Sequence, residues 1–191
     1  MKTRHTFPFP ALAFSVLLGM GITPLFDAVA PVPSACAAVQ TAAEWYQRGS
    51  EAQDAEQYEE AVQDYTEAIC LDPQYAGAYY NRGNAYKGLT QYRAAIEDYT
   101  EAIRLNPQFA AAYNNRGNTY DEMKQYEKAI EDFNEALRLE PSSAKAYAGR
   151  GYSYFCIGRY ADAVQDAKRA DQLAPGSADL VFELLREKGI Q

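Results

Sequence analysis

Apolar residues between positions 110 and 139 recur at steps of three and four. Tyr113, Gly117 and Tyr120 share one face of a first stretch. A second stretch, YEKAIEDFNEALRL, carries an apolar face made of Tyr126, Ala129, Ile130, Phe133, Ala136 and Leu137. Such steps are the spacing of one face of an α-helix. Pro141 follows the second stretch, where it ends a helix. The pattern therefore predicts two consecutive helices.

The same pattern returns along the chain with a period of 34 residues and no insertion. Four glycines keep this step, each with an arginine before it: Gly49, Gly83, Gly117 and Gly151. Columns of tyrosine, alanine and proline follow in register, among them Tyr58, Tyr92, Tyr126, Tyr160, Pro73, Pro107, Pro141 and Pro175. A fixed period of this length is typical of repeat architectures. The predicted units are 42–75, 76–109, 110–143 and 144–177.

Each unit combines small residues with large aromatic ones. The glycine column and the alanine columns let two helices approach closely, and aromatic side chains fill the space beside them. One such hairpin cannot bury its apolar face alone, so neighbouring hairpins must stack. The sequence predicts an all-α solenoid of antiparallel helix hairpins.

These columns resemble the tetratricopeptide repeat (TPR). The resemblance covers residues 42–177 and rests on the aromatic, glycine, alanine and proline columns, which begin with Trp45, Tyr79, Tyr113 and Tyr147. It implies a right-handed superhelix whose first helices line a groove for extended peptides. The chain departs from the family pattern at the arginine before each glycine, where leucine is usual, and at Ala52, Ala167 and Arg169.

Residues 178–191 follow the last unit as an amphipathic segment and tail. Leu180, Val181, Leu184 and Leu185 form its apolar stripe, whereas its charged residues lie elsewhere. We expect a capping helix that closes the open end of the stack. The alternative is an exposed amphipathic helix that recruits a partner.

Residues 1–37 have the layout of a secretory signal peptide. Two basic residues precede the uncharged run ALAFSVLLGMGI, which is shorter than the roughly 20 apolar residues of a membrane span. Ala35-Cys36-Ala37 is the favoured cleavage site. An uncleaved membrane anchor and a lipid-anchored Cys36 are the alternatives. The protein is therefore expected to be exported, periplasmic or extracellular, or else membrane-anchored by an uncleaved N-terminal segment.

Charge and composition narrow the chemistry. The formal net charge is -8 and argues against a nucleic-acid partner, because phosphate binding needs a basic face. The one histidine, His5, lies in the predicted leader, so cleavage would remove every imidazole. The chain carries no phosphate loop, metal-ligand spacing or nucleophile motif. We therefore expect no enzyme activity, no cofactor and no metal site.

Two charged columns are interpreted as a structural ion-pair ladder between helices. Its members are Arg48, Arg82, Arg116 and Arg150 with Asp64, Asp98, Asp132 and Asp166. An arginine stem can cover apolar surface while its guanidinium reaches a carboxylate. The two cysteines after the leader, Cys70 and Cys156, are separated by two whole units, too far apart for a disulfide, and are interpreted as small core or groove residues.

The resemblance places one set of polar and aromatic residues in the groove. These are Tyr46, Tyr80, Asn81, Asn84, Asn114, Asn115, Asn118, Lys145 and Tyr152. An asparagine offers both a donor and an acceptor, so a row of them can pair with the backbone of an extended chain. The alternative is that these amides only satisfy the helix surface. The family's carboxylate clamp is not expected, since Tyr80 and Gly149 replace two of its three cations.

The sequence thus predicts an exported, non-enzymatic scaffold that binds an extended segment of a partner protein in its groove. The alternative is a structural or assembly factor of the cell envelope that self-associates or acts through its convex face and ends. Membrane contact is expected only through an uncleaved leader or a lipidated Cys36.

Overall fold

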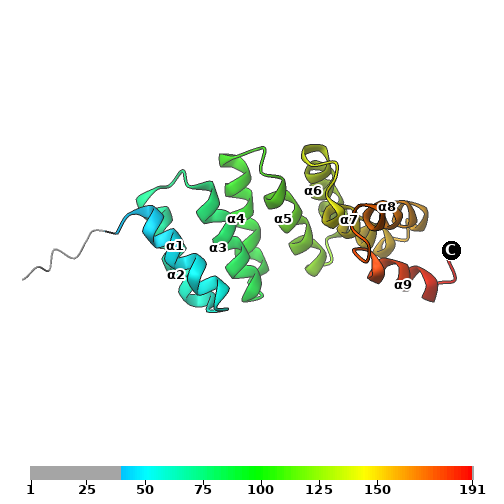
Figure 1. The fold of residues 1–191 in the computed structure, drawn as a ribbon, viewed down its shortest axis with the longest axis horizontal. Coiled ribbons are helices and arrows are strands. Elements are labelled where there is room, and N and C mark those ends of the chain that lie inside the picture. The colour runs from blue at the N-terminus through cyan, green and yellow to red at the C-terminus, as the bar shows by residue number, and fades with distance from the viewer. Residues whose placement is uncertain (1–39, 191) are drawn as a thin grey trace, which may run out of the picture. The chain divides into compact units, whose positions relative to one another are not determined.

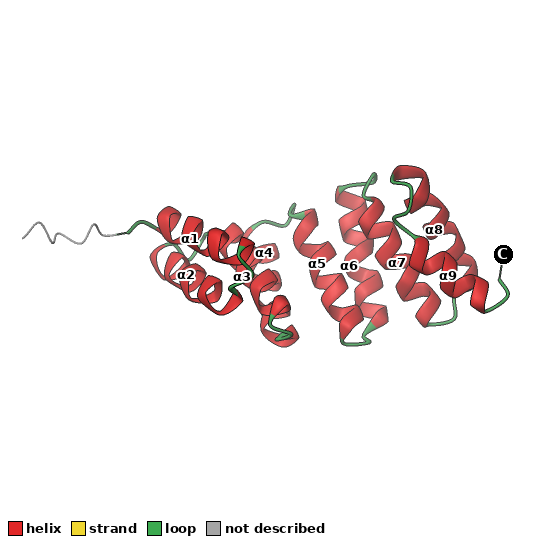
Figure 2. Ribbon diagram, turned by 60° about the horizontal axis from the view of Figure 1, so that its bottom comes forward, coloured by secondary structure: helices red, strands yellow, loops and turns green. Residues whose placement is uncertain are grey.

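The computed structural model describes residues 40–190. The predicted signal peptide, including His5 and Cys36, lies outside them. Within this range every regular element is a helix (Figures 1 and 2). The helices are α1 Ala42–Asp54, α2 Tyr58–Leu71, α3 Ala76–Gly88, α4 Tyr92–Leu105, α5 Ala110–Glu122, α6 Tyr126–Leu139, α7 Ala144–Cys156, α8 Tyr160–Leu173 and α9 Asp179–Glu187. Among α1 to α9, no helix combines the length and the hydropathy that a membrane span requires.

The helices form four hairpins that stack in chain order. Within each unit the first helix packs on the second, and each second helix packs on the first helix of the next unit. The first helices α1, α3, α5 and α7 also contact one another in sequence. Figure 1 shows this succession from blue-cyan α1 to the orange-red α9. The predicted all-α solenoid is confirmed.

The turn inside each hairpin uses the same backbone conformation. Glu56, Thr90 and Lys124 have φ near 58°, and Gly158 follows at the equivalent position with φ 81°. This left-handed region costs a residue with a Cβ free energy, and only the fourth unit places a glycine there. The tight connection between helices therefore depends on packing as well as on turn propensity.

Alanines and three large rings make up most of the core, together with a few aliphatic side chains such as Ile69, Ile130 and Leu137. Tyr65, Tyr99 and Phe133 are completely buried, as are alanines in each hairpin. A Cβ on Gly49 or Gly83 would lie 2.8 Å from the ring of Tyr65 or Tyr99. The glycine column thus makes room for the aromatic ring of its own unit. In the fourth unit Ala167 replaces that ring.

Helix α9 packs on α7 and α8 and closes the end of the stack. Val181 and Leu185 are buried against Ala163, Ala167 and Ala170 of α8. The predicted apolar stripe is partly wrong, because the side chain of Leu180 is 58% exposed. The buried stripe instead includes Ala178, and Phe182 packs at its border.

Candidate peptide-binding face

The two charged columns meet inside each hairpin. Arg82 donates from Nε and Nη2 to both carboxylate oxygens of Asp98, each at 2.7 Å. Arg116 holds Asp132 in the same bidentate geometry, at 2.8 and 2.7 Å. Burial raises the pKa of Asp98 and Asp132, and the hydrogen bonds from the arginines offset part of that rise. These pairs are well aligned and largely excluded from solvent.

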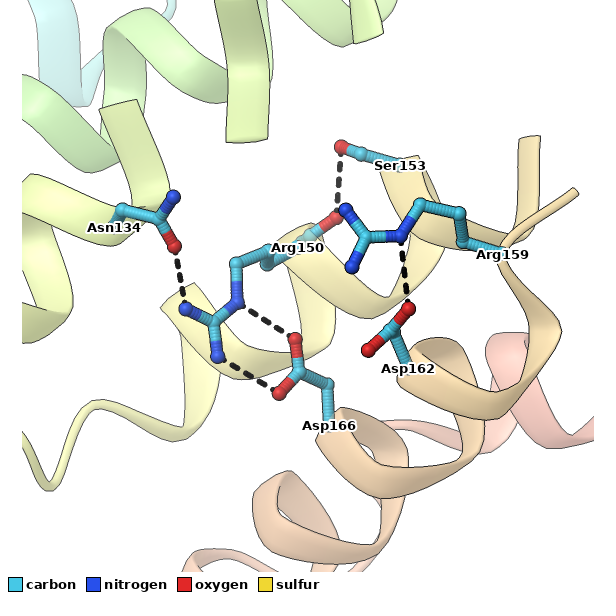
Figure 3. A network of polar contacts seen from close by, with 7 residues as sticks. Asn134, Arg150, Ser153, Arg159, Asp162 and Asp166 are labelled. Carbon is cyan, nitrogen blue, oxygen red and sulfur yellow. Dashed lines mark hydrogen bonds and ion pairs between the residues drawn. The ribbon is translucent and has the colours of Figure 1, made fainter. Parts of the chain in front are cut away.

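The same arginines also reach the preceding unit. Arg82 Nη1 donates to Thr66 Oγ1 at 3.0 Å, and Arg116 Nη1 donates to Thr100 Oγ1 at 2.9 Å. Figure 3 shows the last member, in which Arg150 forks onto Asp166 and reaches Asn134 at 2.5 Å. Each guanidinium therefore joins three helices. Sequence reasoning missed Thr66, Thr100 and Asn134, although they too recur every 34 residues.

The first pair is looser than the others. Arg48 approaches Asp64 at 3.3 Å, and its side chain is 44% exposed, against 16% for Arg82. No unit precedes the first one in the described chain, so Arg48 has no second-helix partner there. Its Nη1 donates to Gln40 Oε1 at 3.4 Å, and its guanidinium lies over the Trp45 ring at 4.6 Å, as that of Arg82 lies over Tyr79.

The predicted groove residues on α1, α3, α5 and α7 are called the first-helix face. Several of its asparagines form hydrogen bonds within the protein. Asn81 Nδ2 donates to Tyr46 Oη at 2.8 Å, and Asn115 Nδ2 donates to Tyr80 Oη at 3.0 Å. Each of these tyrosine–asparagine bridges joins one unit to the next. Asn81 and Asn115 therefore have a structural role beside any role in binding.

A second set of contacts occupies Asn84. Its Oδ1 accepts from Tyr99 Oη at 2.7 Å and from Asn115 Nδ2 at 2.8 Å. The equivalent of Tyr99 in the third unit is Phe133, which has no hydroxyl. Asn118, the equivalent of Asn84, therefore lacks this internal donor. Of the predicted asparagines, it is the one with no side-chain hydrogen bond among those found within residues 40–190.

An open cleft of about 810 Å³ lies where the third and fourth units meet α9. Five predicted groove residues line it: Asn114, Asn115, Asn118, Lys145 and Tyr152. Lys87, Asp121 and Glu122 add charge, and Leu180 and Val181 contribute apolar surface from α9. The predicted residues Tyr46, Tyr80, Asn81 and Asn84 do not line this cleft. The contribution of α9 could not be foreseen from the repeat pattern, because α9 lies outside the repeats.

Asp121 lies on the wall of the cleft in an unusual setting. Ser153 Oγ, from the next unit, is 2.7 Å from Asp121 Oδ1 and 3.1 Å from the carbonyl oxygen of Gly149. Burial, and to a lesser degree the charge of Glu122, raise the pKa of Asp121 to about 7, against the opposing effects of Ser153 and Lys87. Ser153 can donate to the carboxylate, or accept from the protonated acid and donate to Gly149. The contact between the units therefore suits both protonation states.

The two cysteines lie in different surroundings, since Cys156 contacts Tyr152 of the cleft. Both Cys70 and Cys156 are free thiols, and Cys70 is exposed, so its interpretation as a core or groove residue is wrong. Its place near the end of α2 puts it on the outer side of the buried stripe. Among residues 40–190, no group of three or more His, Cys, Asp or Glu side chains could hold a metal ion.

Comparison with known proteins identifies the repeats. A family model described as tetratricopeptide repeat matches residues 76–109 and 110–143, and a second, described as TPR repeat, matches 54–89. The search of curated proteins gave no match.

Solved structures give the same answer. The Arabidopsis OM64 TPR domain is 30% identical with a TM-score of 0.59, and the alignment covers 60% of this chain and 95% of that domain. A crystal structure of MamA is 27% identical with a TM-score of 0.68, covering 80% of this chain and 83% of that one. The first TPR of Spaghetti (RPAP3), bound to an HSP90 peptide, is 27% identical with a TM-score of 0.61, covering 62% and 94%.

Proposed function

We propose that this chain, which belongs to the tetratricopeptide repeat family, is an exported, non-enzymatic scaffold that binds an extended segment of a partner protein on its first-helix face. The family membership and fold support a role in protein–protein interaction. The observation that carries the finer proposal is the cleft of about 810 Å³, lined by amides, two lysines and α9. The first TPR of Spaghetti (RPAP3), which is 27% identical to this chain, was solved bound to an HSP90 peptide, and this supports a peptide as the ligand.

The chemistry of the cleft suits a peptide backbone. Amide side chains can donate to and accept from a main chain whatever its sequence. Asn118 is the amide best placed for this, because its internal donor is replaced by Phe133. Leu180 and Tyr152 offer apolar surface to a side chain of the partner. Extended segments bind by this combination of main-chain hydrogen bonds and side-chain pockets.

The test begins with a partner. The protein is cross-linked in its envelope fraction, and the chains that purify with it are identified. Affinity for the recovered partner is then measured for the double variant Asn118→Ala/Lys87→Ala. We expect a loss of about tenfold, because two polar contacts of roughly 0.5–1.5 kcal/mol each are removed.

The control is Gln63→Ala/Lys168→Ala, which changes the same residue classes on the exposed sides of α2 and α8. It should bind like the unaltered protein. Equal affinity of all three proteins would reject the groove and favour binding through the ends or the convex face. Fractionation tests export separately, since intact leader in the membranes would contradict cleavage.

A further inference from the structure

The junction between the third and fourth units differs from the two junctions before it. At the first junction Tyr46 stacks on Tyr75 with ring centroids 4.8 Å apart. At the second, Tyr80 packs on Phe109 at 4.7 Å. Both tyrosines also accept the asparagine bridge from the following unit. A pair of aromatic rings thus fills the first-helix face at each of these junctions.

The third junction has lost these rings. The residues equivalent to Tyr80 and Phe109 are Asn114 and Ser143. Gly149 stands where the bridging asparagine would be, and a Cβ there would lie 2.5 Å from the Phe133 ring. Asn114 Oδ1 is buried without a hydrogen-bond partner. The internal bridge is therefore missing from both sides at this junction.

A hollow of about 460 Å³ occupies this place. Its apolar lining consists of the ring of Tyr80 and small side chains at Ala110, Ala111, Ala136, Ala144 and Ala174. Asn114 and Ser143, the residues that replace the rings, both line it. The rings that fill the equivalent space at the other junctions are thus replaced here by two short polar side chains beside an open, alanine-lined hollow.

The charged residues around the hollow indicate which residue type of a partner segment would lie next to an aromatic ring bound there. Glu140 lines the hollow, whereas Lys87, Asp121 and Glu122 line the adjoining cleft. Lys145 is the charged residue common to both, and it forms no ion pair within residues 40–190. A segment that runs from the hollow into the cleft must pass Lys145. An acidic residue next to the ring would complement this cation.

We propose that the hollow binds an aromatic side chain of an extended partner segment, with an acidic residue beside it that pairs with Lys145. The partner's ring replaces the pair that the chain itself supplies at the first two junctions. Aromatic side chains bury about 150–250 Å² each and dominate the energetics of many interfaces. The proposal rests on the proposed function and specifies the chemistry of the segment that the same face binds.

The test refills the hollow with the protein's own rings. Asn114→Tyr/Ser143→Phe restores the residues of the second junction. Random twelve-residue peptides are selected on the full chain by display, and the affinity of the recovered peptides is measured for both proteins. We expect peptides enriched in an aromatic–acidic pair, and a loss of at least tenfold on the refilled variant. Replacing the acidic residue of such a peptide by lysine should also weaken binding.

The matched control is Glu59→Tyr/Gln63→Phe, which adds the same two rings to exposed positions of the second helix α2, away from the first-helix face. It should bind the peptides unchanged, and thermal unfolding should show that the refilled variant is folded. Peptides without aromatic enrichment, or peptides that bind the refilled variant equally well, would overturn the proposal. If Asn118→Ala/Lys87→Ala still weakens the binding of these peptides, the proposed groove function stands and only the proposal about the hollow fails. If no peptide binds, or if no variant of the first-helix face changes the affinity, both the groove function and the proposal about the hollow fail.

Discussion

At the scale of single residues, the arginine column does more than pair with aspartate. Each of Arg82, Arg116 and Arg150 also bonds a polar side chain of the preceding unit. A buried ion pair adds little net stability over apolar packing, but loss of one partner leaves a buried charge without compensation. The ladder thus penalises any arrangement in which the units slip relative to one another.

Replacement of Asp98 by alanine should therefore be costly. Asp98→Ala removes the counter-charge of Arg82, whose side chain is 16% exposed, and leaves Thr66 as its one remaining side-chain hydrogen-bond partner. We expect a loss of about 2–4 kcal/mol in the free energy of unfolding, measured by urea denaturation. Glu97→Ala, an exposed neighbour on the same helix, should change stability by less than about 0.5 kcal/mol. Equal losses would contradict a structural ladder.

Asp121 should make stability depend on pH. Its pKa is raised to about 7 in the folded protein, chiefly by burial, against about 4 in an unfolded chain. The folded state thus binds the proton more tightly, so stability falls as the pH rises from about 4 to about 7. Because the group is partly exposed, we expect a fall of only about 2 kcal/mol between pH 5 and pH 8.

The matched variant is Asp121→Asn, which keeps an acceptor for Ser153 but cannot titrate. Urea denaturation at pH 5, 6, 7 and 8 should show a flatter profile for the variant, while the other carboxyl groups contribute equally to both. Parallel profiles for the two proteins would show that Asp121 titrates outside this range.

At the scale of helices, close packing depends on which residue faces each glycine. A Cβ at Gly83 would meet the fully buried Tyr99 ring at 2.8 Å, whereas a Cβ at Gly151 would have its nearest contact, Asp166 Cβ, at 3.3 Å. The difference arises because Ala167 replaces the ring in the fourth unit. A side chain at the column glycine should therefore cost different amounts of stability in different hairpins.

Gly83→Ala should destabilise the protein by about 1–3 kcal/mol, since the ring or the helix must move to admit a methyl group. Gly151→Ala should cost less than about 1 kcal/mol, because the better helix propensity of alanine offsets a milder clash. Midpoints of thermal or urea unfolding for both variants measure the contrast. If Gly151→Ala destabilises the protein as much as Gly83→Ala, the facing aromatic ring is not the reason that this column requires glycine.

At the scale of the described chain, each hairpin contacts only its neighbours, so stability is close to a sum of unit and junction terms. The junctions are not equal. The first two are closed by rings and tyrosine–asparagine bridges, and the third is open and adjoins α9. The open space of the first-helix face within residues 40–190 thus lies at its C-terminal end, where we propose that a partner segment binds.

The sequence by itself determined the hairpins, their period and the pairing of arginine with aspartate. These features depend on residues within one unit, 16 positions apart in the case of Arg82 and Asp98, and a fixed period exposes them. The first-helix face was also found by column, including Asn118, Lys145 and Tyr152 of the cleft.

Only the tertiary structure decided how units meet. It showed that Asn81 and Asn115 donate hydrogen bonds to tyrosines of the preceding unit. It also showed that Thr66 and Thr100 accept hydrogen bonds from the ladder arginines, and that Leu180 of α9 is exposed beside the cleft. These contacts join side chains from two or three separate units, and α9 belongs to no repeat. The repeat pattern gives the residue type at each position of a unit. The volume left between neighbouring units depends on how they pack, so the hollow at Asn114 could be seen only in the tertiary structure.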